Sequence, residues 1–185
     1  NTCIAVPLAY SLYHGAGRKG SLAAKIVSVM PVAVPAITLG FGYIIVFNTD
    51  ILPWFGTLPL LIAAHTVQTL PYLTNTLLAD LRHLDLGRLE RAAATLGASP
   101  TAQFLGIVLP NLRQSLISGL VMVVAISVGE FGLSNLLASF QNRTYPIVLL
   151  QAFYGASGFA CAATVILLLL ASASALISST VVRKS

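Results

Sequence analysis

Residues 159–182 read FACAATVILLLLASASALISSTVV, a stretch that carries no charged side chain. A helix of roughly 20 mostly apolar residues is enough to cross the hydrocarbon core of a bilayer, so this stretch predicts a transmembrane helix. The composition of the 185-residue chain agrees, because 57% of its residues are hydrophobic and only 8% are charged, against roughly 25% charged residues in an ordinary soluble domain. A conventional water-soluble enzyme and a disordered chain are both excluded.

Three more stretches are long and apolar enough to span a membrane, namely residues 26–47, 57–79 and 115–137. Residues 2–13 are apolar too, but they have about half the length that a span needs. We expect them to be the end of a fifth helix whose start precedes this sequence. The chain is therefore predicted to be an N-terminally truncated, all-α, polytopic transmembrane bundle that forms a single domain over residues 1–185. Cys3 and Cys161 each stand alone and predict no metal site.

The basic residues are distributed unevenly between the loops. The chain carries 10 Lys and Arg residues against 5 Asp and Glu. All the basic residues except Arg143 lie before residue 26, between residues 79 and 115, or after residue 182. These segments fall on one side of the membrane, which the positive-inside rule makes cytoplasmic. A nucleic-acid partner would need basic residues gathered on one polar face, so none is expected.

The longest polar stretch, residues 81–111, lies on that cytoplasmic side. Its first half contains apolar residues at helical spacing, which are Leu86, Leu89, Ala93 and Leu96. Asp85 is placed to cap this helix, and Gly97 suits its C-terminal turn. Ser99 and Pro100 are typical of a helix start and predict a second short helix that ends before the next span. The apolar stripe must be buried, either against the chain's own helix ends or in a groove of a partner.

The same loop resembles the EAA loop of binding-protein-dependent ABC importer permeases. The family pattern is Glu-Ala-Ala, three residues, Gly, nine residues and Ile-x-Leu-Pro, and its spacing is matched by Arg91-Ala92-Ala93, Gly97 and Ile107-Val108-Leu109-Pro110. Arg91 departs from the pattern, because the family usually has Glu there, and Glu90 stands one place earlier. The resemblance implies that this loop docks on a cytoplasmic ATPase. The docking helix would contain Glu90, Arg91, Ala92, Ala93 and Gly97, with Gly97 setting its turn. Ile107, Leu109 and Pro110 would fix the exit of the loop back toward the membrane.

Two further stretches are similar to one branch of these permeases, which imports sulfate, molybdate, iron(III), thiamine and polyamines. They are Val128-Gly129-Glu130-Phe131-Gly132 and the proline-rich stretch from Met30 to Pro35. The resemblance implies the type I importer permease fold in a bacterial or archaeal plasma (inner) membrane, with a cytoplasmic C-terminus. It further implies a non-catalytic subunit that binds no cofactor itself. ATP and Mg²⁺ would bind a partner ATPase dimer, and the other partners would be a second permease copy or half and an extracytoplasmic solute-binding protein.

Glu130 is the only acidic residue deep within a predicted span, and intramembrane carboxylates are costly and commonly functional. Either it hydrogen-bonds to neighbouring helix ends and holds a break between Gly129 and Gly132, or it contacts the solute pathway. His65 and Gln68 lie one turn apart and either face Glu130 or the pathway, or form hydrogen bonds between helices. The alternative function is an ion-coupled secondary transporter that uses Glu130 and His65 as a proton relay. Glu130 also slightly favours a cationic solute over an anion.

Overall fold

The computed structural model describes residues 1–15 and 19–183, and the side chains of residues 19–22, 177–179 and 181–183 are outside the description. The described chain is helical apart from turns and an isolated antiparallel bridge between Asn48 and Pro53, which confirms the all-α prediction. In chain order the elements are α1 (Thr2–His14), α2 (Lys19–Ala33), α3 (Ala36–Phe47), α4 (Leu58–His83), α5 (Leu86–Thr95), α6 (Pro100–Gln103), the π-helix η1 (Phe104–Val108), α7 (Leu109–Gly129), α8 (Gly132–Leu137), α9 (Tyr145–Gly155) and α10 (Ser157–Arg183).

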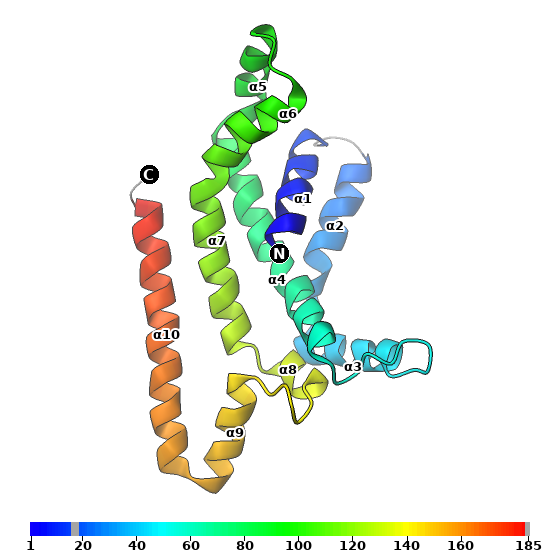
Figure 1. The fold of residues 1–185 in the computed structure, drawn as a ribbon, viewed down its shortest axis with the longest axis vertical. Coiled ribbons are helices and arrows are strands. Elements are labelled where there is room, and N and C mark those ends of the chain that lie inside the picture. The colour runs from blue at the N-terminus through cyan, green and yellow to red at the C-terminus, as the bar shows by residue number, and fades with distance from the viewer. Residues whose placement is uncertain (16–18, 184–185) are drawn as a thin grey trace.

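The central helix of the bundle is α4. It packs against both α1 and α7, and α10 lies along α7 (Figure 1). The main hydrophobic core lies where α4 meets α1 and α7, and Leu73, Leu77 and Leu81 of α4 are fully buried in it. Ala5 and Ala9 on α1 are one turn apart and also fully buried. Because these side chains are small, the backbones of α1 and α4 can approach each other closely.

Two helices of the described chain are long and apolar enough to cross a membrane, Pro100–Gly129 and Ser157–Leu176. A further candidate is the bent pair Ala23–Ala33 and Ala36–Phe47, whose two helices are bent by 104° at the break. The prediction of one continuous helix over residues 26–47 is therefore wrong. Pro35 has no N–H to donate to a helix, and it disfavours helical conformation at the residue before it, so the helix breaks there.

The helix α4 covers the predicted span at residues 57–79 and continues to His83. Its first turn is capped by Thr57, whose hydroxyl accepts a hydrogen bond from the Leu60 N–H at 3.4 Å. The 26 residues of α4 are about 39 Å long at 1.5 Å per residue, enough to cross a bilayer, but α4 is not among the helices apolar enough to qualify. Neighbouring helices can satisfy polar groups at membrane depth, and α4 has such neighbours.

The predicted span over residues 115–137 begins too late, whereas the break between Gly129 and Gly132, one of the two alternatives for Glu130, is present. α7 continues without interruption from α6 and η1, so residues Pro100–Gly129 form a single helix of 30 residues. The second loop helix is therefore an extension of a span and not a separate element. At the other end the helix stops at Gly129, Glu130 is extended, and α8 begins a new short helix at Gly132.

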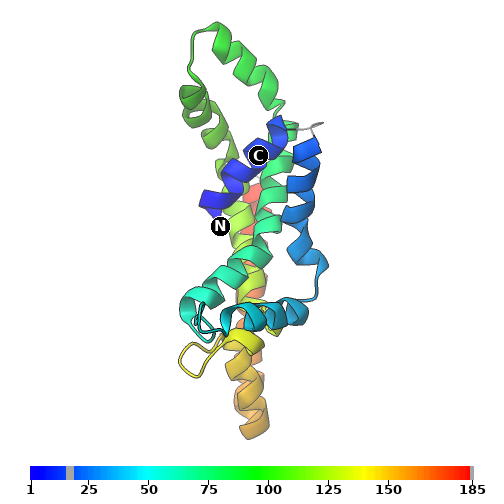
Figure 2. The same cartoon turned by 90° about the vertical axis from the view of Figure 1, so that its right-hand side faces the viewer.

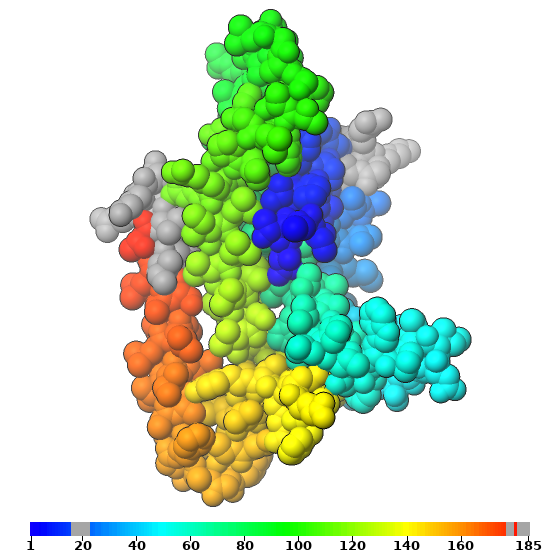
Figure 3. Space-filling model, in the orientation of Figure 1, coloured from blue at the N-terminus to red at the C-terminus, as the bar shows by residue number. Residues whose placement is uncertain are grey.

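The elements α5 and α6 project from one end of the molecule, and the turn between α9 and α10 lies at the other (Figure 1). The view turned by 90° shows the same projection beyond the end of α1 (Figure 2). In the space-filling view its tip extends beyond the rest of the molecule, while atoms of α1 lie against its base (Figure 3). The end of α1, the start of α2 and the C-terminal end of α10 lie toward this same end. The segments predicted to be cytoplasmic thus gather at one end.

Candidate functional site

The helix α5 forms the first arm of the projecting loop. Asp85 occupies its N-cap position, but its side chain accepts no capping hydrogen bond, so the prediction of an Asp85 cap is wrong. A capping side chain needs an extended backbone, whereas Asp85 is left-handed with φ +45°. Gly97 follows the other end with φ +84°, as predicted. The Gly97 N–H donates to the Ala94 carbonyl and the Ala98 N–H to the Ala93 carbonyl, both at 3.0 Å, which is a Schellman motif.

The second arm of the loop begins at Ser99 and Pro100, as predicted. The Ser99 hydroxyl accepts a hydrogen bond from the Ala102 N–H at 3.3 Å, and Pro100 is at the start of the helix, where no N–H is needed. The chain then passes through the π-helical turn η1, in which the Leu109 N–H donates to the Phe104 carbonyl. This wider turn lies directly before Pro110, where an ordinary α-helical turn would bring the proline ring against a carbonyl.

The apolar side chains of the loop divide into a buried and an exposed set. Leu86, at the start of α5, is fully buried, whereas Leu96 at its end is 88% exposed. Leu89 and Leu105 are exposed as well, and so are Arg91 and Ala92. The predicted stripe is thus buried in the chain's own core only at its first turn. Of its remainder, Ala93 is half-buried, and Leu89 and Leu96 are exposed on α5 toward the loop tip.

Glu90 points toward α1. Its carboxylate accepts a hydrogen bond from the Tyr10 hydroxyl at 2.8 Å, and His14 Nε2 lies 3.1 Å from its other oxygen. The Glu90 residue is only 8% exposed. One turn earlier, the Gly87 N–H donates to the Tyr13 hydroxyl at 3.0 Å. We refer to Tyr10, His14 and Glu90 as the Glu90 clamp.

Tyr10 and His14 were not singled out from the sequence. The signal that could have indicated them is their spacing, because residues four apart on a helix share a face, and both are polar side chains at the end of an otherwise apolar segment. Their rings contact each other edge to face at 4.5 Å between centroids. The Tyr10 ring also contacts Phe104 edge to face at 5.3 Å, so α1 contacts both arms of the loop.

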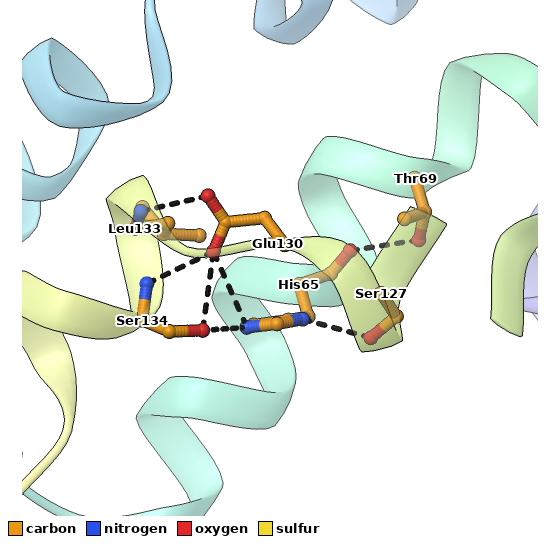
Figure 4. Close-up of polar contacts among 6 residues, drawn as sticks. All are labelled: His65, Thr69, Ser127, Glu130, Leu133 and Ser134. Carbon is orange, nitrogen blue, oxygen red and sulfur yellow. Dashed lines mark hydrogen bonds and ion pairs between the residues drawn. The ribbon is translucent and has the colours of Figure 1, made fainter. Parts of the chain in front are cut away.

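Glu130 lies at the break between α7 and α8 and caps α8 (Figure 4). Its carboxylate accepts hydrogen bonds from the Leu133 N–H at 2.8 Å and from the Ser134 N–H at 2.9 Å. The Ser134 hydroxyl donates to the same oxygen at 3.1 Å. Four N–H groups at the start of any helix lack a helical partner, and the carboxylate satisfies two of them here. Glu130 therefore hydrogen-bonds to a neighbouring helix end, as the first of the two alternatives predicted. Its contact with the solute pathway stays a prediction.

His65 connects α4 to both sides of that break. Its Nδ1 lies 2.8 Å from the Ser127 hydroxyl on α7, and its Nε2 lies 2.8 Å from the Ser134 hydroxyl on α8. Nε2 is also 3.8 Å from the Glu130 carboxylate. The side chains of His65 and Glu130 are only 13% and 8% exposed. The structure therefore brings His65 and Glu130 together with two serines, and both ring nitrogens of His65 are in hydrogen bonds.

The other residues predicted near Glu130 are placed differently. Within the described residues Gln68 forms no hydrogen bond or ion pair with Glu130 or His65, and its buried Oε1 has no hydrogen-bond partner there. A Cβ added to Gly132 would lie 3.4 Å from Ala36 and Ile37 of α3, whereas one added to Gly129 would meet nothing within 4 Å. A close approach to a neighbouring helix thus occurs at Gly132 and not at Gly129. No group of His, Cys, Asp and Glu in the described ranges could hold a metal ion.

Comparison with known proteins agrees with this architecture. The chain is 30% identical over 148 residues to the molybdate/tungstate transport system permease protein WtpB of Pyrococcus abyssi, covering 80% of this chain and 57% of the relative. It is 26% identical over 125 residues to PhnV of Salmonella paratyphi A, named for 2-aminoethylphosphonate transport, covering 68% and 47%. A relative from Nephroselmis olivacea, named for sulfate transport, is 28% identical over 155 residues, covering 76% and 54%.

The chain spans about half the length of these relatives. The family model described as "Binding-protein-dependent transport system inner membrane component" matches residues 5–185, which is nearly the whole chain. The chain therefore belongs to the family of binding-protein-dependent transport system inner membrane components, the permeases of ABC importers.

Proposed function

We propose that the chain forms the solute pathway of an ATP-driven importer and couples it to a separate cytoplasmic ATPase. The family match over residues 5–185 supports the permease role. The observation that carries the coupling role is the exposed face of α5 toward its end, where the side chains of Leu89, Ala92 and Leu96 are exposed. An exposed apolar helix face is typical of a segment that binds in a partner's groove.

The loop is held rigidly enough to transmit movement to the spans. Its turn is fixed by the Schellman motif at Gly97 and by the Ser99 cap, and its base is held by the buried Leu86 and by the Glu90 clamp. The second arm continues as a single helix from Pro100 to Gly129. Movement of the loop tip by an ATPase would therefore be carried directly along α7 toward the Glu130 break, because packed helices move as discrete bodies.

The remaining partners follow from this role. The loop and the C-terminus would be cytoplasmic, as the positive-inside rule indicates, and the gathering of the corresponding helix ends at one end of the molecule supports that orientation. The working complex would contain an ATPase dimer that binds ATP and Mg²⁺, a second permease copy or half, and an extracytoplasmic solute-binding protein. The chain itself would hydrolyse nothing.

We propose a small oxyanion as the solute, in preference to iron(III), thiamine or a polyamine. The relatives are named for molybdate or tungstate, 2-aminoethylphosphonate and sulfate. Glu130 gave a slight preference for a cation, but its carboxylate is already bonded to two backbone N–H groups and a hydroxyl. These donors stabilise the negative charge of the carboxylate. The presence of Glu130 is therefore a weak argument against an anionic solute.

An ion-coupled carrier is the alternative, and the 3.8 Å approach of His65 to Glu130 favours it. Direct proton transfer between the two would have to displace the hydrogen bond between His65 Nε2 and the Ser134 hydroxyl and compete with the bonds from Glu130 to the start of α8. The family match supports the ATP-driven mechanism. The energy source distinguishes the two, because uptake that continues without ATP and stops when the proton gradient is collapsed would establish the carrier.

The test uses the full-length permease, purified with its ATPase and reconstituted in proteoliposomes with its binding protein and labelled molybdate, sulfate or 2-aminoethylphosphonate. We expect uptake to require ATP hydrolysis. The variant Ala92→Asp would place an unpaired charge in the docking surface and should lower uptake and ATPase co-purification at least about tenfold. Gln141→Asp, an exposed position in the loop before α9, is the control and should change neither. Normal uptake and co-purification with Ala92→Asp would overturn the coupling role.

A further inference from the structure

We propose that Tyr10 and His14 are positioning residues for coupling: by holding the Glu90 carboxylate, they make α1 move together with α5 when the ATPase drives the loop. This inference rests on the proposed function, because it needs the loop to be the element that the ATPase moves. It adds that α1 carries the movement into the centre of the bundle, beside α4 and the His65–Glu130 group. It therefore gives the loop a second route inward, separate from α7.

The contacts of the clamp are close, and its carboxylate is sheltered from water, although the His14 side chain is 42% exposed. Both carboxylate oxygens of Glu90 have partners on α1, at 2.8 Å for Tyr10 and 3.1 Å for His14. The Glu90 side chain is 10% exposed. Hydrogen bonds to an ionised group are stronger than those between neutral groups, and they strengthen further where water is excluded. The two helices are joined here although Tyr10 and Glu90 are 80 residues apart in the chain.

A second attachment makes the clamp a constraint on orientation. The start of α5 is already held by the bond between the Gly87 N–H and the Tyr13 hydroxyl, and by the buried side chain of Leu86. A helix held only at that point could still rotate or pivot about it. Glu90 adds contacts one turn further along, so α5 is fixed to α1 at two levels. Movement of α5 therefore has to carry α1 with it or break the clamp.

The other end of α1 reaches the middle of the bundle. Its 13 residues are about 20 Å long at 1.5 Å per residue. The preceding residue, Asn1, donates through its side-chain amide to the Thr69 hydroxyl at 2.9 Å. Thr69 in turn donates to the His65 carbonyl at 2.7 Å (Figure 4). Because Ala5 and Ala9 are fully buried along the way, α1 is in contact with the core throughout. It thus joins the Glu90 clamp to the residue that holds the Glu130 break.

Contiguous contacts do not by themselves establish coupling, which has to be measured as an energy. The experiment compares solute molecules imported per ATP hydrolysed in the reconstituted full-length transporter. The variants are Tyr10→Phe, which removes only the hydroxyl, His14→Ala, and Glu90→Leu. Glu90→Gln is the conservative variant, because an amide can accept from Tyr10 and donate to a neutral His14. Tyr154→Phe, at an exposed tyrosine on α9 far from the loop, is the matched control.

We expect Tyr10→Phe and His14→Ala to lower the transport-to-ATP ratio, and Glu90→Leu to lower it about tenfold, as the loss of hydrogen bonds to a buried charge would. ATPase co-purification with Tyr10→Phe should be unchanged. Glu90→Gln should restore most of the ratio, and Tyr154→Phe should match the unmodified protein. Adding Tyr10→Phe to Glu90→Leu should have no further effect, because the shared contact is already lost.

The opposite results would overturn the inference. Unchanged ratios in Tyr10→Phe and Glu90→Leu, or effects of the two that simply add, would show that the clamp does not couple. A loss of folded permease or of bound ATPase in Tyr10→Phe, with the ratio of the remaining transporter unchanged, would show a purely structural contact. If the unmodified transporter imports its solute without ATP, the proposed function fails instead. The two failures are therefore distinguishable in the same set of vesicles.

Discussion

Glu90 and Glu130 both have side chains that are at most 10% exposed, and their carboxylates are hydrogen-bonded in different ways. Glu130 accepts hydrogen bonds from backbone N–H groups three and four residues further along the chain. Glu90 accepts from the side chain of Tyr10, which is 80 residues away. Both are close to a histidine, at 3.8 Å for His65 and 3.1 Å for His14. One carboxylate therefore determines a local backbone shape, and the other joins two helices that are far apart in sequence.

The difference teaches how each site can respond to change. Backbone N–H groups are donors only, so the Glu130 position requires an acceptor at both oxygens. A tyrosine hydroxyl can donate or accept, and a neutral histidine nitrogen can do either according to its tautomer. A substitution of Glu90 by another side chain that both donates and accepts hydrogen bonds can therefore be tolerated. We expect Glu130 to be a fixed structural element and Glu90 to be an adjustable contact.

The largest effect is expected for Glu130→Gln. The new amide would direct an NH₂ group at one of the two backbone donors and leave that N–H unsatisfied in a buried site. We expect the free energy of unfolding to fall by about 3 kcal/mol, the upper range for an unsatisfied buried group. The measurement is titration with denaturing detergent in mixed micelles, followed by helical circular dichroism. A loss below about 0.5 kcal/mol would contradict the capping role of Glu130, because surface changes already produce effects of that size.

The helix break at Glu130 could be predicted because its causes are local. Gly129 and Gly132 flank an acidic residue in an apolar run, and the bonds that form the break lie within four residues of it. The turn at Gly97 and the cap at Ser99 were predictable for the same reason. These features depend on residue types that favour one backbone conformation.

The features that sequence reasoning missed depend on distant or competing interactions. The contact between Tyr10 and Glu90 joins segments 80 residues apart, and no local pattern encodes it. Asp is a common N-cap residue, yet Asp85 has a left-handed backbone and its side chain accepts no hydrogen bond from the first turn of α5. The second loop helix was expected to end before the next span, but the π-helical turn η1 accommodates Pro110 and the helix continues. The bend at Pro35 was not predicted, because an apolar run of spanning length does not show whether its helix is straight.

A smaller effect is expected at Glu90, and it should depend on the substituent. Glu90→Leu leaves the Tyr10 hydroxyl and His14 without their partner, and the free energy of unfolding should fall by about 2 kcal/mol. Glu90→Gln should lower it by less than half as much, because the amide can replace both contacts. The same detergent titration applies. If Gln were as harmful as Leu at position 90, the contrast between an adjustable Glu90 and a fixed Glu130 would be lost.

The two serines around His65 sharpen the comparison at the Glu130 break. The Ser134 hydroxyl contacts both His65 and Glu130, whereas the Ser127 hydroxyl contacts His65 alone. Ser134 is also fully buried. We expect Ser134→Ala to lower the free energy of unfolding by about 1.5 kcal/mol and Ser127→Ala by about half of that. Equal losses would show that the Glu130 side of the network contributes nothing beyond the His65 contact.

The smallest effect is expected at the loop tip, where a local backbone requirement acts without any side-chain partner. Gly97 has φ +84°, and a Cβ added there would meet nothing within 4 Å. The strain in Gly97→Ala therefore comes from the backbone conformation alone, about 1 kcal/mol for a left-handed residue. Gly97→Asn should cost less, because Asn tolerates this conformation, although its side chain is the larger of the two. A loss that followed side-chain size instead, with Asn worse than Ala, would indicate that the surface of the tip matters more than its turn. ATP-driven uptake can be compared in the reconstituted transporter. Higher uptake with Gly97→Asn than with Gly97→Ala would mean that the loop acts through its backbone shape. Lower uptake with Gly97→Asn would place Gly97 directly against the ATPase.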